Sequence, residues 1–212
     1  MEIEAKFTVP DVETLRRLEA MNTLAGFGLT PGKVKQVHDT FLDTVDRRII
    51  ASGYVCRRRQ VDGQILITLK WSGSVEGAIH RREELEVKLP ADLPLTQWPP
   101  SEIRDRLWPI VGDAPLHPLF DQQQRRVVRM VTQGNRMSVA ELSLDEVEVV
   151  IEDQRRHYFE IEVEIKADGT EAELAVIEAY LRDEWGLMPE PRSKFRRGFE
   201  LLLSTEGTTS DA

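Results

Sequence analysis

The stretch Met1-Glu2-Ile3-Glu4-Ala5-Lys6-Phe7 decides the fold. Successive side chains of a β-strand point to opposite faces, so a strand here places two carboxylates and one amine on one face. The apolar side chains then occupy the other face. A strand in a water-facing sheet has the same alternation, so the remainder of the chain must decide what the charged face does.

The same alternation recurs along the chain, which predicts an antiparallel sheet. Residues 54–61 and 64–71 predict a hairpin turned by Asp62-Gly63, a strong signal for a two-residue loop. Further strands are expected over residues 34–43, 82–89, 120–131, 136–144 and 157–166. Residues 146–152 either extend the strand before them or begin the next one.

Helices are expected at three places, outside the predicted strands. Apolar residues at helical spacing follow Pro10, a second helix is expected over residues 101–111, and a third begins at Thr170, whose pairing with Glu173 predicts a capping box. Residues 47–52 form a short connector. We expect one domain over residues 1–203 and a disordered tail over residues 204–212.

Composition excludes several classes of protein. The 212 residues are 41% hydrophobic and 31% charged with a net charge of −9, which is ordinary for a globular protein and disfavours nucleic acid as a partner. Cys56 is the single cysteine, so we expect no disulfide framework. The sequence has neither an apolar run of membrane-spanning length nor a signal-peptide pattern. We expect a cytoplasmic monomer or homodimer.

Two arrangements satisfy the alternating charges. Either an open sheet exposes its charged face to water, or the sheet closes into a barrel with the charges inside. Segregation of the charges by strand favours the barrel: Arg57, Arg59 and Lys70 form a basic wall, and Glu-x-Glu pairs recur at residues 2–4, 84–86 and 160–164. Buried charge needs counter-charges, a metal or an anionic ligand.

The pairing of these two charge types suits polyphosphate chemistry. Arg and Lys bind phosphate oxygens. Carboxylates bind hard cations such as Mg²⁺ or Mn²⁺, which bridge phosphates.

The chain also resembles the CYTH domain, that is, the triphosphate tunnel metalloenzyme superfamily. The resemblance covers residues 1 to about 200 and rests on several pieces in family order: Glu2-x-Glu4-x-Lys6, residues 38–44, Arg57-Arg58-Arg59, Thr68-Leu69-Lys70, residues 82–86, residues 141–145, Glu160-x-Glu162-x-Glu164 and Ser193-Lys194-x-x-Arg197-Gly198. It implies an α+β fold, a closed antiparallel eight-stranded β-barrel with a charged interior and helices packed outside. It further implies metal-dependent hydrolysis of inorganic triphosphate, thiamine triphosphate or a nucleoside triphosphate.

Within that resemblance each charged residue receives an expected role. The catalytic residues are expected to be Glu4, Lys6, Arg57, Arg59, Lys70, Arg126 and Lys194. The substrate-binding residues are Lys6, Arg57, Arg59, Lys70, Arg82, Arg126, Lys194 and Arg197. The candidate metal ligands, for Mg²⁺ or Mn²⁺, are Glu2, Glu4, Glu84, Glu86, Asp145, Glu160, Glu162 and Glu164. Of these, Asp145, Glu84 and Glu86 either ligate metal or orient basic groups.

One position departs from the family pattern. Gln124 stands where a basic residue is expected, so one phosphate contact is either weakened or supplied by Arg125 or Arg129. The four histidines are not at metal-ligand spacing and are assigned surface or structural roles. Two other functions remain open, an adenylate cyclase of the same superfamily and a non-catalytic polyphosphate- or nucleotide-binding module.

Overall fold

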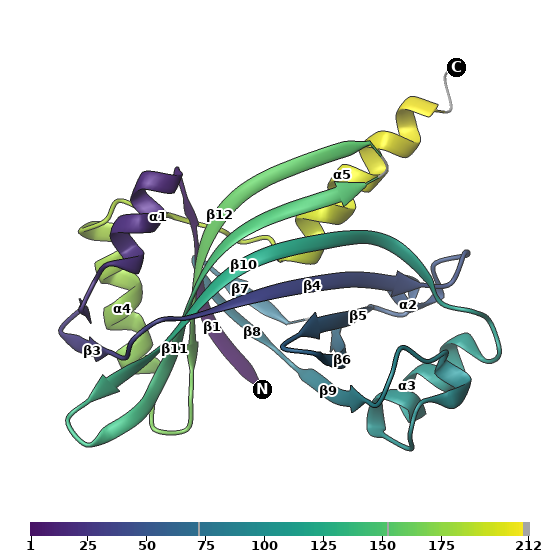
Figure 1. Ribbon diagram of the computed structural model, residues 1–212, viewed down its shortest axis with the longest axis horizontal. Coiled ribbons are helices and arrows are strands. Elements are labelled where there is room, and N and C mark those ends of the chain that lie inside the picture. Colours follow the sequence, from purple (N-terminus) through teal and green to yellow (C-terminus); the bar gives the residue numbers. More distant parts are fainter. Residues whose placement is uncertain (72, 152, 210–212) are drawn as a thin grey trace.

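The computed structural model describes residues 1–71, 73–151 and 153–209. Figure 1 shows long curved strands with helices at their periphery. The elements are β1 (Glu2–Val9), α1 (Val12–Glu19), β2 (Thr23–Leu24), β3 (Phe27–Leu29), β4 (Lys33–Asp43), α2 (Arg48–Ala51), β5 (Tyr54–Val61), β6 (Gln64–Trp71), β7 (Ser74–Glu76), β8 (Ile79–Arg82), β9 (Glu84–Leu89), the 3-10 turn η1 (Leu95–Gln97), α3 (Glu102–Val111), β10 (His117–Gln133), β11 (Arg136–Ile151), β12 (Gln154–Ile165), α4 (Glu171–Asp183), β13 (Met188–Pro189) and α5 (Lys194–Thr209).

The strands form one curled antiparallel sheet. Its order is β7-β8-β1-β12-β11-β10-β4-β5-β6-β9, with β13 beside β1, and β2 and β3 joined to β10. The opening strand β1 pairs with β12 and β8, so the first residues of the chain lie inside the sheet. The predicted hairpin is present, and Asp62 and Gly63 both have positive φ angles of 51° and 71°, as a type I′ turn requires.

The prediction of a closed eight-stranded barrel is wrong. The described part of the chain forms a 13-stranded sheet whose hydrogen-bonded path ends at β7 and β9, an open half-barrel. The physical reason is a break at Glu83. One strand was expected over residues 82–89, but the chain forms two strands on either side of Glu83, β8 and β9. Strand β8 pairs with β1, whereas β9 pairs with β6, so the two ladders do not merge.

The apolar face of the sheet is covered by helices in separate clusters, as Figure 1 shows for α1 and α4 on one side and α3 on the other. Ala5 and Phe7 of β1 are fully buried in the cluster that includes residues of α1 and α4. Helix α3 packs with β6 through a second cluster. Because the apolar side chains of β1 pack against helices, its charged side chains occupy the concave face.

The ends of two elements bear on the expected boundaries. Strand β11 continues to Ile151, so residues 146–151 extend the strand before them, which was one of the two expected alternatives, while residue 152 lies outside the described residues. Helix α5 runs to Thr209 through the segment in which a disordered tail was expected from residue 204; residues 210–212 of that segment are not described. No helix in the described residues has the length and apolar character needed to span a membrane.

Candidate functional site

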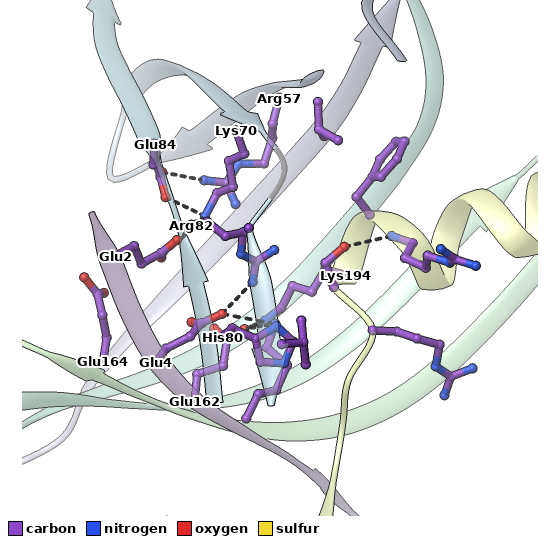
Figure 2. A pocket seen from close by; sticks show the side chains of 18 of the residues that line it. Glu2, Glu4, Arg57, Lys70, His80, Arg82, Glu84, Glu162, Glu164 and Lys194 are labelled. Carbon is purple, nitrogen blue, oxygen red and sulfur yellow. Dashed lines mark hydrogen bonds and ion pairs between the residues drawn. The ribbon is translucent and has the colours of Figure 1, made fainter. Parts of the chain in front are cut away.

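A cavity of about 1070 Å³ lies along the concave face of the sheet. Ten Lys or Arg side chains and eight Glu side chains line it. Figure 2 shows that Glu2 and Glu4 of β1 lie opposite Lys70 and Arg82, which come from β6 and β8. The alternation read from the sequence therefore places cations and carboxylates around one shared space.

Most of the sequence-predicted site residues line this cavity. They are Glu2, Glu4, Lys6, Arg57, Arg59, Lys70, Arg82, Glu84, Glu86, Arg126, Glu162, Glu164 and Lys194. The other three stand behind the lining. Asp145 and Glu160 are fully buried, and Arg197 lies over the Tyr158 ring, with its guanidinium carbon 3.3 Å from the ring centroid.

The basic wall rests on a carboxylate to which the sequence analysis gave no role. Asp39 of β4 accepts hydrogen bonds from Arg59 Nε at 2.7 Å and Arg59 Nη2 at 2.8 Å, and Arg57 Nη1 lies 3.6 Å from Asp39 Oδ2. Burial opposes ionisation of Asp39, but Arg57 and Arg59 outweigh it and hold the pKa of this carboxyl well below its usual range. A buried anion thus fixes two guanidiniums at the cavity wall.

Gln124 completes this arrangement and overturns one expectation. Its Nε2 donates to Asp39 Oδ2 at 2.7 Å. Neither proposed substitute reaches the cavity: Arg125 pairs with Glu19 at 2.6 Å, and Arg129 donates to backbone carbonyls at the end of α1, including that of Glu19 at 3.0 Å. Of the two alternatives, supply of the phosphate contact by Arg125 or Arg129 is therefore wrong, because both side chains lie on the outward face of β10.

A row of carboxylates crosses three neighbouring strands. Glu4 of β1 is directly opposite Glu164 of β12, and Glu164 is opposite Glu141 of β11. Burial raises the pKa of Glu164 and outweighs its pairing with Lys166 at 2.7 Å, and the charges of Glu2 and Glu141 raise it further. Like charges in opposed positions repel, so this row favours a cation. Glu141 lines the cavity but was not among the predicted ligands.

At the open seam of the half-barrel, one ion pair connects two strands that share no ladder: Lys70 Nζ of β6 lies 3.0 Å from Glu2 of β1. Within the ladders on either side of the seam, Lys70 also lies 2.5 Å from Glu84 of β9, and Arg82 of β8 donates to Glu4 of β1 at 2.8 Å. The Lys70–Glu2 pair therefore links β6 to β1 where backbone pairing stops, among the side chains shown in Figure 2.

The inner end of the cavity contains a dense ion-pair cluster at the start of α5. Lys194 Nζ lies 2.9 Å from Asp145 and 2.8 Å from Glu162, and it also contacts Glu160. Arg126 pairs with Asp145 at 2.5 Å and with Glu162 at 2.8 Å. Burial raises the pKa of Glu160, whereas in Glu162 the nearby cations outweigh burial and lower the pKa.

His80 is another cavity residue to which the sequence gave no functional role. It is 2% exposed, lines the cavity and lies opposite Glu4 in the β1–β8 ladder. Its Nε2 is 2.8 Å from the backbone carbonyl of Glu190. Burial lowers the pKa of His80, and the charge of Lys6 lowers it further. Spacing alone carried no signal for it, because its position depends on where β8 joins the sheet.

Comparison with known proteins gives one family match and a set of similar folds. The family model of the CYTH domain matches residues 1–199. Among solved structures, HpAC1 from Hippeastrum, a proposed adenylyl cyclase described as having a dominant triphosphatase activity, is 22% identical with a TM-score of 0.69, over 94% of this chain and 96% of that one. A proposed adenylate cyclase from Bacillus halodurans is 21% identical with a TM-score of 0.60, over 94% and 97%. The PH1819 protein of Pyrococcus horikoshii OT3 is 18% identical with a TM-score of 0.58, over 94% and 99%.

Proposed function

The chain belongs to the CYTH domain family, and from that premise we propose that it is a divalent-metal-dependent triphosphatase whose substrate is inorganic triphosphate. The observation that carries the proposal is the cavity itself. It combines a fixed basic wall with a row of carboxylates on facing strands. Phosphoryl transfer requires cationic side chains that bind the phosphates and carboxylate oxygens that coordinate a hard metal ion.

The phosphate chain would lie against Arg57, Arg59, Lys70, Arg82 and Arg126. Two of these side chains have a buried donor to spare: Arg57 Nε and Arg82 Nε have no hydrogen-bond partner among the described residues. A buried N–H without a partner is costly, and a phosphate oxygen would satisfy it. Asp39 keeps two of the guanidiniums in place before substrate arrives, so little reorganisation is needed on binding.

The charge balance of the wall supports a requirement for metal. Ten cationic side chains line the cavity, but they face eight Glu residues, and Asp39, Asp145 and Glu160 stand directly behind them. The cavity lining and the residues behind it are thus close to neutral in total, and they do not by themselves offset the negative charge of a triphosphate.

The carboxylates of β1 and the outer end of β12 fit a divalent cation. Glu2, Glu4 and Glu164 would hold Mg²⁺ or Mn²⁺, because these ions take carboxylate oxygens as ligands. Bound there, the cation supplies charge neutralisation and orientation of the attacking water. The chain's own part is to align the phosphates with Arg57, Arg59 and Arg126 and to keep Lys6 beside Glu162, at 2.8 Å. No nucleophilic triad is built at the cavity by the described residues, so we propose direct attack by water.

A larger substrate is the second candidate. The cavity of about 1070 Å³ is as large as sites for drug-sized ligands, and Phe41, Val55 and Phe195 give one part of its wall an apolar surface. That surface favours an organic triphosphate, such as a nucleoside or thiamine triphosphate, over the inorganic one. The same feature would serve an adenylate cyclase, which expels pyrophosphate from ATP.

A substrate-by-metal screen tests the proposal. Phosphate release is measured from inorganic triphosphate, thiamine triphosphate and ATP with Mg²⁺, Mn²⁺ or a chelator. Glu4→Gln and Lys6→Ala are expected to lose at least a hundredfold in turnover, whereas the matched surface changes Glu102→Gln and Lys33→Ala retain it. Full metal-dependent activity in both cavity variants would refute the mechanism.

The remaining outcomes separate the alternatives. Cyclic AMP formed without phosphate release would identify a cyclase and overturn the proposed hydrolysis. Tight binding of triphosphate with no turnover under any metal condition would identify a binding module.

A further inference from the structure

Three carboxylates at the inner end of the cavity have the spacing of a metal site. One oxygen from each of Asp145, Glu160 and Glu162 lies within 4.8 Å of the other two. Two of the three side chains are fully buried and the third is 12% exposed. By spacing alone, this cluster competes with the carboxylate row as the place for a divalent cation.

The side chain of Lys194 lies among these three carboxylates. Its ammonium is 2.9 Å from Asp145 and 2.8 Å from Glu162, and it is hydrogen-bonded to Glu160. An ammonium has three N–H donors and no acceptor. With one carboxylate oxygen available for each donor, the lysine is saturated by the cluster.

We infer that the Asp145–Glu160–Glu162 cluster is filled by the chain's own ammonium and does not take a divalent cation. This rests on the proposed function, in which the metal is held at Glu2, Glu4 and Glu164. The inference assigns Asp145 and Glu160, both predicted as metal ligands from the sequence, to the positioning of Lys194 and its neighbours.

The surrounding charges support this assignment. Besides Lys194, the three carboxylates contact Arg126, Lys6 and Arg197. Four cations therefore face three anions, and a divalent ion entering the cluster would meet excess positive charge in a buried setting. In the carboxylate row, Glu4 pairs with Arg82 and Glu164 pairs with Lys166, but among the described residues no single cation pairs with Glu141, Glu164 and Glu4 together, as Lys194 does with the three carboxylates of the cluster.

The backbone at Lys194 is also held in place. Gln122 Nε2 donates to the Lys194 carbonyl at 3.0 Å, and Arg197, one turn on in α5, pairs with Glu160 at 3.2 Å. Gly198 packs so closely on Phe120 that a Cβ there would be 2.2 Å from the ring. Withdrawing the ammonium would therefore disturb the docking of α5, which makes its replacement by a metal ion unfavourable.

Manganese binding to the full chain without substrate tests the inference. Titration calorimetry and Mn²⁺ electron paramagnetic resonance would be applied to the natural protein, Lys194→Met, Lys194→Arg and Asp145→Asn. We expect Lys194→Met to bind one more Mn²⁺ per chain than the natural protein and Lys194→Arg, which keeps the charge, to bind no more. Asp145→Asn should keep the natural Mn²⁺ affinity within about threefold.

Either of two results would overturn the inference: unchanged Mn²⁺ stoichiometry in folded Lys194→Met, or a loss of tenfold or more in the Mn²⁺ affinity of Asp145→Asn. If Lys194→Met does not fold, the Mn²⁺ affinity of Asp145→Asn tests the inference by itself. Failure of the proposed function is distinguishable, because a natural protein that binds no Mn²⁺ would contradict the metal requirement while the extra ion in Lys194→Met would still be expected.

Discussion

Replacing Asp39 with Asn is expected to destabilise the free protein because two arginines lose their buried counter-ion. Asp39 is fully buried, while the side chains of Arg57 and Arg59 are 11% and 15% exposed. Removing one partner of a buried pair costs about 3–5 kcal/mol. We expect about 3 kcal/mol here, the lower end, because both guanidiniums reach the water of the cavity.

Urea and thermal unfolding measure this change. For a domain of this size each kcal/mol lowers Tm by roughly 2–4 °C, so Asp39→Asn should melt about 6–12 °C below the natural protein. Inorganic triphosphate, added with a chelator to prevent turnover, should raise the Tm of Asp39→Asn more than that of the natural protein. The reason is that both guanidiniums are then free to pair with phosphate.

A matched change on the surface provides the control. Asp121 pairs with His38 at 2.8 Å, and both side chains are 41% exposed. Asp121→Asn should therefore cost less than about 1 kcal/mol. An Asp39→Asn protein within 1 kcal/mol of the natural one, or one that triphosphate stabilises no better, would refute the role given to Asp39.

Unfolding at acid pH independently checks whether the ionised carboxylate of Asp39 stabilises the folded protein. The folded protein holds the pKa of Asp39 below its usual value of 3.8, so the carboxylate contributes stability above that pH and loses it as the pH falls further. The difference in unfolding free energy between the natural protein and Asp39→Asn should therefore narrow below pH 3.8. A difference that widened on acidification would contradict the assignment.

Three further predictions concern the scaffold. Gly198→Ala should lower stability by about 1–3 kcal/mol, because its Cβ would lie 2.2 Å from the Phe120 ring; an unchanged Tm would contradict the close docking of α5. Arg129→Ala should lower Tm by several degrees with phosphate release unchanged, because this side chain binds Thr30 and the end of α1, not the cavity; a selective loss of activity would contradict that. A short extension before Met1 should reduce turnover more than stability, because Met1 lines the cavity and Glu2 pairs with Lys70; full activity of the extended chain would argue against an ordered start.

Much of the site followed from local alternation. Because side chains along a strand alternate with a period of two, the sequence was enough to predict that Glu2, Glu4 and Lys6 share one face and that Ile3 and Ala5 share the other. The same rule, applied to β10, would have placed Arg125 and Arg129 on the outer face, opposite to Arg126. The resemblance to the CYTH domain gave these local patterns an order along the chain, and the family match over residues 1–199 agrees with it.

The tertiary structure decided what depends on partners distant in sequence. Whether the sheet closes was set by the break at Glu83, which sends β8 to β1 and β9 to β6. The carboxylate of Asp39 became a counter-ion only because β4 lies beside β5 and β10. Lys194 reached the acidic cluster from α5, across 34 residues of sequence from Glu160. Local alternation sets the face on which a charge lies, whereas the folded chain sets which charge it meets.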